Sequence, residues 1–134
     1  MKINVENCPF RISEKLVAIL EKEIEKSGVD ASHGVIINFR DPDYSAREGG
    51  YHPVEIMIGP DNAIHYITDF AYVGTPPYQE LSKEIDFDFS AGVFGHLGQD
   101  YKLGEGIGLF QVYMPNFCTY YASGVYKEIK VSPL

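Results

Sequence analysis

Tryptophan is absent from this chain of 134 residues, cysteine occurs only twice, and long apolar runs are lacking. A helix needs about 20 consecutive apolar residues to cross a bilayer, so the sequence excludes membrane spans of that kind. The first residues, "MKINVENCPFRISEK", hold no apolar segment of signal-peptide length. We therefore expect a cytoplasmic protein that does not associate with membranes.

The two cysteines, Cys8 and Cys118, lie far apart in the sequence. The C-x-x-C spacing of redox and zinc sites is missing, which excludes those motifs. In a chain without an export signal, thiols of this kind are typically reduced and packed in the interior. We predict two unbridged cysteines and no cofactor.

Basic residues are scarce: 11 Lys and Arg stand against 19 Asp and Glu, for a formal net charge of −8. No segment gathers the basic cluster that nucleic-acid binding requires. Nucleic acids and anionic membranes attract proteins through cationic side chains that neutralise phosphates. The charge balance therefore predicts that neither is a partner.

The overall composition is typical of a globular protein. Apolar residues make up 45% and charged residues 22% of the chain, without repeats or low-complexity tracts. The length suits one domain, residues 1–134, with a core of its own. Ten tyrosines and eight phenylalanines favour the half-buried positions of a large sheet.

Residues 12–28, "ISEKLVAILEKEIEKSG", predict an amphipathic helix. Ser13 is placed to cap its first turn, and Gly28 is placed to end it in a left-handed conformation. Apolar side chains recur on one face at helical spacing, opposite the charged ones, and should cover an apolar surface. This apolar stripe consists of Leu16, Val17, Leu20 and Ile24.

Four later segments are interpreted as β-strands, three of them because apolar and polar residues alternate with a period of two, and the third in chain order because of its strand-rich composition. They are residues 34–41, 54–58, 63–73 and 85–92. The segment "GPDN" between the second and the third favours a tight turn, so we expect these two to form an antiparallel hairpin. The third segment is apolar on both faces, which favours cover on both sides.

The other segments are assigned mainly by composition. Residues 74–84 and the glycine-rich 95–106 are interpreted as connections, and 125–131 alternates like a final strand. Residues 107–124 are mostly apolar and aromatic and predict a helix, in which Pro115 must produce a kink or begin a second short helix. The order helix, strands, helix, strand predicts an α+β fold with both helices on one face of an antiparallel sheet.

The segment "REGGYHPVEI", residues 47–56, places two glycines, a histidine and a proline ahead of a strand. Gly49 and Gly50 permit backbone angles that other residues resist, and His52 before Pro53 is restricted to extended geometry. A phosphate-binding loop would lead into a helix, whereas this segment leads into a strand. We interpret it as a turn into a strand.

The run "RDPDYSAREGGYHPVEI", followed by "ITDFAYVG" and "EIDFDF", resembles an uncharacterised bacterial family. This family is a domain of unknown function found largely in marine and enteric gamma-proteobacteria and on their mobile elements. The resemblance extends from about residue 34 to 126, and "EGGYHPVEI" is its most specific part. It implies no catalytic residues.

In fold, that family resembles the acidic mitochondrial matrix glycoprotein family. The resemblance implies a strongly twisted antiparallel sheet with N-terminal and C-terminal helices packed on one face. It also implies self-association and multifunctional binding without established enzyme chemistry. This sequence is shorter and lacks the long acidic loop and the targeting segment of those proteins, so their trimeric ring and their ligands do not carry over.

Carboxylates and one histidine form a candidate metal site. If the strands pair in chain order, Glu55, Asp86 and Asp88 share the face opposite the core. His65 and Asp69 of the intervening strand could join them, and such a set can bind a divalent cation. The alternative is a solvated face whose charges prevent aggregation, and the spacing does not decide between the two.

The C-terminal helix has more aromatic residues than one helix face needs for a core. Most of them should pack on the sheet, and any remainder would form a patch for self-association or for a protein partner. The candidate interaction residues are Phe110, Tyr113, Phe117, Tyr120 and Tyr121.

The sequence contains no assembled catalytic motif, since its histidines are scattered and its serines lack a nucleophile context. The leading hypothesis is therefore a non-enzymatic acidic binding protein, either a homo-oligomer or a docking surface for a basic segment of a protein partner. The alternative is a small metal-dependent or small-molecule enzyme that uses the acidic face of the sheet.

Overall fold

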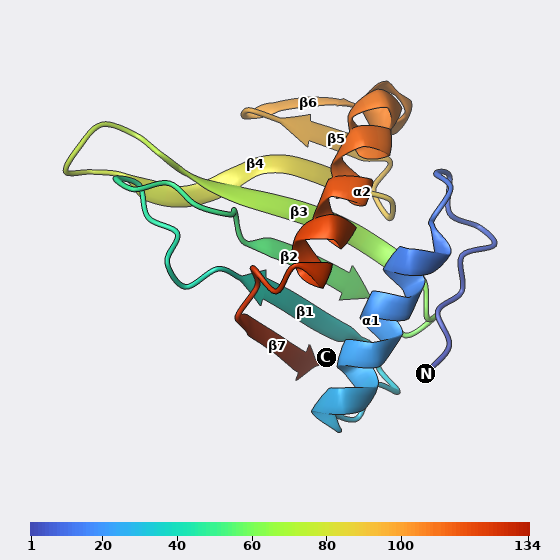
Figure 1. The fold of residues 1–134 in the computed structure, drawn as a ribbon. Coiled ribbons are helices and arrows are strands. Elements are labelled where there is room, and N and C mark those ends of the chain that lie inside the picture. Colours follow the sequence, from blue (N-terminus) through green and yellow to red (C-terminus); the bar gives the residue numbers. More distant parts are fainter.

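The computed structural model describes residues 1–134 (Figure 1). Its helices are α1 (Glu14–Ser27), the 3-10 helix η1 (Leu103–Gly106) and α2 (Ile107–Ala122). Its strands are β1 (Val35–Arg40), β2 (Val54–Ile58), β3 (Ile64–Val73), β4 (Glu80–Asp88), β5 (Val93–His96), β6 (Gln99–Lys102) and β7 (Glu128–Pro133).

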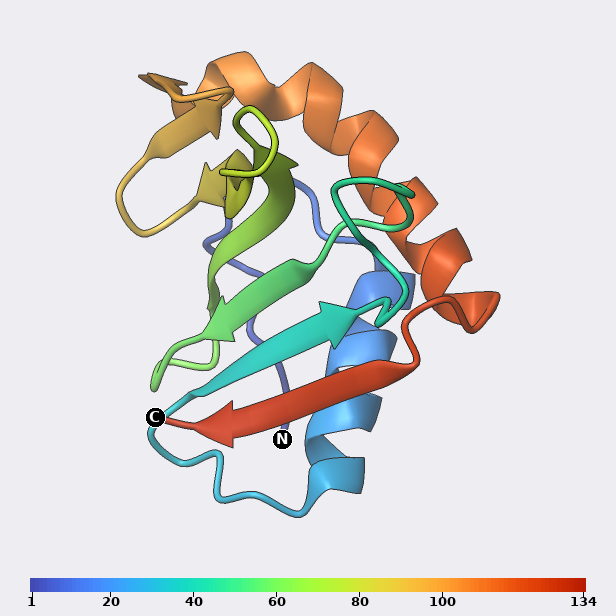
Figure 2. The same ribbon diagram turned by 90° about the vertical axis from the view of Figure 1, so that its left-hand side faces the viewer.

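All strands belong to one seven-stranded antiparallel sheet with the order β6-β5-β4-β3-β2-β1-β7. Strands β1 to β6 lie side by side in chain order, and β7 returns to pair with β1 at the opposite edge from β6. Figures 1 and 2 show both α-helices on the same side of the twisted sheet, which leaves its other face without helices. The predicted α+β class, with N-terminal and C-terminal helices on one face, is confirmed.

The covered face of the sheet holds the hydrophobic core. Alternation along β1 buries Ile37 and Phe39 completely. The Phe39 ring packs edge-on against Phe117 of α2, with 5.0 Å between the ring centroids. Near the start of α2, Phe110 packs edge-on against Phe87 of β4, with 5.1 Å between the ring centroids. These aromatic contacts hold α2 on the sheet and fix which face is covered.

Helix α1 begins and ends where the sequence predicts. The Ser13 hydroxyl accepts a hydrogen bond from the Leu16 amide at 3.2 Å. Gly28 adopts a φ angle of 70° and donates its amide to the Glu25 carbonyl. Leu16 and Leu20 are buried against the sheet side, so the apolar stripe covers the core as expected.

The segment 95–106 is not a loop, and this prediction is wrong. The segment holds the end of β5, all of β6 and η1. The turn between the two strands contains Leu97 and Gly98, which both have positive φ angles, 51° and 81°. Two-residue hairpin turns require such angles, but leucine rarely adopts them, so the turn gives no clear sequence signal. Strand β4 likewise begins at Glu80, inside the segment 74–84 for which composition predicts a connection.

Helix α2 continues through Pro115 as a single helix, so the second short helix does not form. Neither α-helix is long and apolar enough to cross a membrane. Cys8 and Cys118 are both unbridged, as predicted, and Cys118 is buried.

Candidate functional site

The uncovered face of the sheet carries the acidic residues that strand alternation places there. Glu55 of β2 pairs with Thr68 of β3, and Thr68 pairs with Asp86 of β4. Asp88 follows two residues after Asp86 and therefore lies on the same face. The Tyr66 hydroxyl, also on this face, donates a hydrogen bond to Glu55 at 2.6 Å. Three of the five predicted metal ligands therefore share this face, but strand β3 separates Glu55 from the two aspartates of β4, and the three do not form a cluster close enough to hold one ion.

Short hydrogen bonds fix the two aspartates of β4. The Thr68 hydroxyl donates to Asp86 Oδ1 at 2.7 Å. Asp88 Oδ1 accepts from the Ser90 hydroxyl at 2.7 Å and from the Ala91 amide at 2.9 Å. Because these donors already hold the two carboxylates in place, a cationic group would bind them with a small loss of side-chain entropy.

Beside these aspartates the sheet surface is hollowed. A cavity of about 520 Å³ lies over β4, β5 and β6. Gly95 of β5 pairs with Asp86 and leaves this space unfilled, because it has no side chain. We call this cavity the acidic hollow. Its four carboxylates and its single ammonium group belong to Glu84, Asp86, Asp88, Asp100 and Lys83.

Negative charge dominates in the acidic hollow. Burial raises the pKa of Asp86, and the charges of Asp88 and Asp100 raise it further, whereas the Thr68 hydrogen bond and Lys83 lower it. Lys83 Nζ is 4.0 Å from Asp86 Oδ2, and its side chain is 65% exposed. An exposed ion pair of this length contributes little, so the hollow lacks a strong countercharge.

His65 and Asp69, the other two predicted ligands, lie elsewhere. His65 is the additional residue of a β-bulge in β3, and its Nε2 atom is 2.9 Å from Asp61 Oδ1 in the preceding turn. Asp69 pairs with the core residue Val54 and therefore faces the helices. The prediction that these two residues could join the carboxylates of the open face is wrong. The bulge displaces His65, and the alternation of side chains along β3 directs Asp69 to the covered face.

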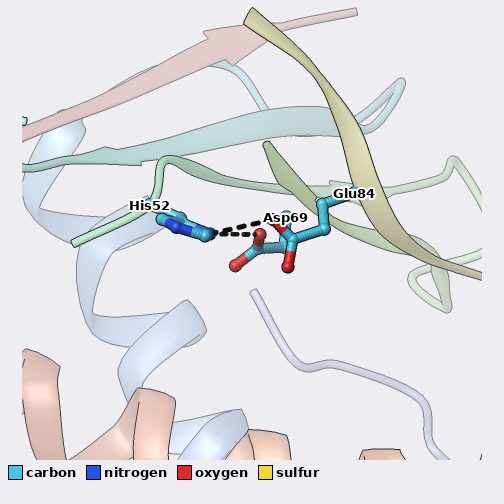
Figure 3. Close-up of side chains that lie close together, drawn as sticks. All are labelled: His52, Asp69 and Glu84. Carbon is cyan, nitrogen blue, oxygen red and sulfur yellow. Dashed lines mark hydrogen bonds and ion pairs between the residues drawn. The ribbon is translucent and has the colours of Figure 1, made fainter. Parts of the chain in front are cut away.

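Three side chains meet on the helix side of the sheet, next to α2 (Figure 3). His52 Nδ1 is 2.9 Å from Asp69 Oδ1 and 3.7 Å from Glu84 Oε2. The Tyr113 hydroxyl donates to the other oxygen of Asp69 at 2.7 Å. These four residues line a cavity of about 370 Å³, which we call the His52 pocket.

Two backbone features aim these side chains into the pocket. His52 stands two residues before the buried Val54, so extended geometry before Pro53 places it on the core side. Glu84 is the additional residue of a bulge in β4, and a bulge turns a side chain out of the regular alternation. Sequence reasoning missed both residues. The spacing to Val54 could have identified His52, whereas the bulge at Glu84 leaves no pattern.

The His52 pocket is poor in positive charge. Asp69 is 5% exposed, and burial raises its pKa, while hydrogen bonds from Tyr113 and His52 lower it. Burial, together with the charge of Asp69, raises the pKa of Tyr113 well above its usual value, so this hydroxyl remains a donor. No lysine or arginine lines the pocket, which leaves His52 as the one side chain able to offset its carboxylates.

The candidate interaction residues of α2 are divided between the core and the surface. Phe110 and Phe117 are buried in the core, and Tyr113 is taken up by its hydrogen bond to Asp69. These three residues do not belong to an exposed patch.

The last two candidates lie near the C-terminal end of α2. The Tyr121 hydroxyl donates to Glu23 of α1, and burial and this contact raise the pKa of Tyr121 to about 12. Tyr120 is exposed and packs against Tyr51, with 4.8 Å between the ring centroids. The exposed remainder is therefore small, and a role for it in contacts with a partner stays a prediction.

Comparison with known proteins identifies the family of the chain. The model of DUF2787, a family of proteins of unknown function, matches residues 14–132. The chain belongs to this family. The DUF2787 match includes α1 and most of β7, so it is longer than the region of about 34 to 126 indicated by the motifs. No curated protein matches the chain.

Two solved structures from Vibrio cholerae are similar in fold to this chain. The hypothetical protein VC0508 from the VSP-II pathogenicity island has 33% identity and a TM-score of 0.79, over 93% of this chain and 96% of that one. The conserved hypothetical protein VC1805 from pathogenicity island VPI-2 has 33% identity and a TM-score of 0.81, over 95% of this chain and 98% of that one. VC1805 is described as sharing structural homology with the human P32 protein, in agreement with the fold resemblance inferred from the sequence.

Proposed function

We propose that the protein is a binding protein that docks a basic segment of a protein partner on the uncovered face of its sheet, at the acidic hollow. The observation that carries the proposal is a preformed cavity lined by four carboxylates, in which the only lysine is exposed and lies 4.0 Å from one of them, Asp86. Burial is the main cause of the raised pKa of Asp86, and repulsion by Asp88 and Asp100 adds to it. A lysine or arginine side chain placed there would relieve this repulsion.

The architecture supports docking on this face. Helices cover the opposite face, so the open face is free to receive an extended segment (Figure 2). The formal net charge of −8 attracts basic proteins over long range and repels nucleic acids, which accelerates encounter with the proposed partner. The fold similarity to VC1805 is compatible with an interaction role.

Binding of a labelled oligolysine peptide, followed by fluorescence anisotropy, tests the proposal. The decisive variant is Asp86→Asn/Asp88→Asn, which removes two charges from the hollow. The matched control is Glu14→Gln/Glu25→Gln, which removes two exposed charges from α1 on the other side of the sheet. We expect the first variant to bind about tenfold more weakly, a loss of about 1.4 kcal/mol, and the control to bind like the wild type.

Equal weakening in both variants would show that the peptide responds to overall charge and not to the hollow, and would contradict the proposal. An oligoglutamate peptide of the same length is the negative control. Its binding would exclude charge complementarity as the cause.

Self-association is a second candidate function, because the structure leaves both edge strands of the sheet, β6 and β7, without a partner on one side. Unpaired edges offer backbone donors and acceptors to another copy of the chain. Sedimentation velocity over a range of concentrations tests it. A homo-oligomer predicts a sedimentation coefficient that rises with concentration, and a constant monomer value would contradict it.

A further inference from the structure

We propose that the His52 pocket is a binding site for one divalent transition-metal ion of the zinc class, with His52 Nδ1, Asp69 Oδ1 and Glu84 Oε2 as its protein ligands. Glu84 lines both this pocket and the acidic hollow, but the metal ligands proposed here lie on the His52 side of it. Of the ligands predicted from the sequence, the site includes only Asp69.

The geometry of the three ligand atoms fits a single ion. Zinc bonds to nitrogen and oxygen are about 2.0–2.2 Å long, so two ligands of one tetrahedral ion lie about 3.3–3.6 Å apart. His52 Nδ1 is 2.9 Å and 3.7 Å from the two carboxylate oxygens, and all three atoms lie within 4.8 Å of one another. The three side chains lie close together (Figure 3), so the proposal requires the side chains, and not the strands, to adjust around the ion.

The donor set selects the kind of ion. One imidazole nitrogen with two carboxylate oxygens suits zinc, cobalt, nickel or manganese, whereas calcium and magnesium prefer oxygen ligands alone. Three protein ligands leave at least one coordination position free, as in zinc sites that also bind water or substrate. The cavity of about 370 Å³ provides the space for such an additional ligand.

Residues around the ligands hold them in place. The Tyr113 hydroxyl donates to Asp69 Oδ2 at 2.7 Å and leaves Oδ1 directed at His52. The ring of Tyr44 packs on the His52 ring, with 5.1 Å between the centroids. Supporting contacts of this kind orient metal ligands and typically change metal affinity by about 10–100-fold when removed.

The charge of the pocket also favours a dication. Asp69 and Glu84 bring two carboxylates into a space whose other side chains are mostly aromatic, and no lysine or arginine enters it. A bound dication would neutralise both carboxylates and would replace the proton that His52 shares with Asp69. An organic cation could neutralise the charge but would not bond to His52 Nδ1, the ring atom that faces both carboxylates.

Titration with cobalt(II), followed by visible absorption and by the melting temperature, tests the site. We expect one ion per chain, absorption bands of a low-coordinate cobalt centre, and a higher melting temperature with cobalt(II) or zinc(II). Glu84→Gln and His52→Ala should each weaken cobalt binding at least about tenfold, and Tyr113→Phe should weaken it about tenfold with the ligands intact.

The controls use the same residue types outside the pocket. His33→Ala and Glu14→Gln replace exposed side chains and should leave cobalt affinity unchanged. Glu84 is the first variant to examine, because its side chain is 28% exposed and its replacement should not prevent folding. Asp86→Asn/Asp88→Asn should bind cobalt like the wild type, which separates this site from the acidic hollow.

Three results would overturn the proposal. The wild type could show neither cobalt absorption bands nor a rise in melting temperature with metal, or Glu84→Gln could bind cobalt as tightly as the wild type. The third result is stabilisation of the protein by ethylguanidine but not by zinc(II). The last result would assign the pocket to an organic cation.

Discussion

At the scale of single residues, the crowded carboxylates of the open face should influence stability as well as binding. Burial raises the pKa of Asp86 above its unfolded value, and Asp88 and Asp100 add to the shift. An ionised Asp86 therefore costs stability above its folded pKa, and this cost is absent below its unfolded pKa. We expect Asp86→Asn to raise the melting temperature at about pH 7. Near pH 3 the variant should melt like the wild type, because the side chain at position 86 is then uncharged in both proteins.

Thermal unfolding of the wild type and of Asp86→Asn at the two pH values measures this difference. Asparagine keeps an oxygen that can accept the Thr68 hydrogen bond, so the substitution changes mainly charge. Glu25→Gln on the exposed side of α1 serves as the control and should show no comparable gain at neutral pH. A lower melting temperature for Asp86→Asn at neutral pH would show that Lys83 outweighs the neighbouring carboxylates.

Gly34 is the residue at which backbone geometry leaves least freedom. Its φ angle is 97°, and a Cβ atom would lie 2.6 Å from the Ile58 carbonyl oxygen. We expect Gly34→Ala to lower the free energy of unfolding by roughly 1–3 kcal/mol, as measured by urea denaturation. At Gly108 of α2, a Cβ atom would have no neighbouring atom within 4 Å, so Gly108→Ala should be neutral or stabilising by up to about 1 kcal/mol. Equal changes in the free energy of unfolding at the two positions would contradict this account.

The placement of single side chains was predictable where strands alternate regularly. Glu55, Asp86 and Asp88 reach the predicted face because no irregularity separates them from their core neighbours. His65 and Glu84 are the additional residues of two bulges, and a bulge shifts side chains without changing the apolar pattern. The His52 pocket depends on one of these bulges, so the sequence could not indicate it as a group.

At the scale of elements, the N-terminal cap of α1 should make a measurable contribution to the free energy of unfolding. Ser13 accepts the Leu16 amide, and loss of such a cap typically costs about 1 kcal/mol. We expect Ser13→Ala to lower the free energy of unfolding by about this amount in urea denaturation, and Ser13→Asp to retain it, because aspartate also caps well. Equal destabilisation by both variants would mean that the hydroxyl contributes through packing instead.

Elements with a strong period or with end signals were predictable, and short ones were not. Helix α1 has a cap, an apolar stripe and a terminal glycine, and all three appear in the structure. Strands β5 and β6 have four residues each, too few for a period to emerge, and Leu97 occupies a turn position that favours glycine or asparagine. The pairing of β5 with β4, which attaches this hairpin to the sheet, is decided by tertiary contacts that the local sequence does not encode.

At the scale of the whole molecule, one-sided helix cover and negative charge act together. The helices bury one face of the sheet and leave the other free (Figure 2), so the acidic hollow on the free face is accessible to a partner that the charge of −8 attracts. Electrostatic docking on such a surface is screened by salt, with a Debye length of about 8 Å at physiological ionic strength.

We therefore expect oligolysine affinity to fall steadily as sodium chloride is raised from low to physiological concentrations, in anisotropy titrations on the wild type. The Asp86→Asn/Asp88→Asn variant should show a shallower dependence, because fewer charges take part. An affinity that does not change with salt would indicate that contacts other than charge dominate and would contradict docking through the hollow.

The most direct test of docking at the acidic hollow is a titration of ¹⁵N-labelled protein with oligolysine, followed by ¹H–¹⁵N correlation spectra. The account predicts that the largest shift changes map to β4 and β5 around Asp86 and Gly95, with α1 unaffected. Shift changes confined to the helices, or spread evenly over all exposed carboxylates, would contradict it.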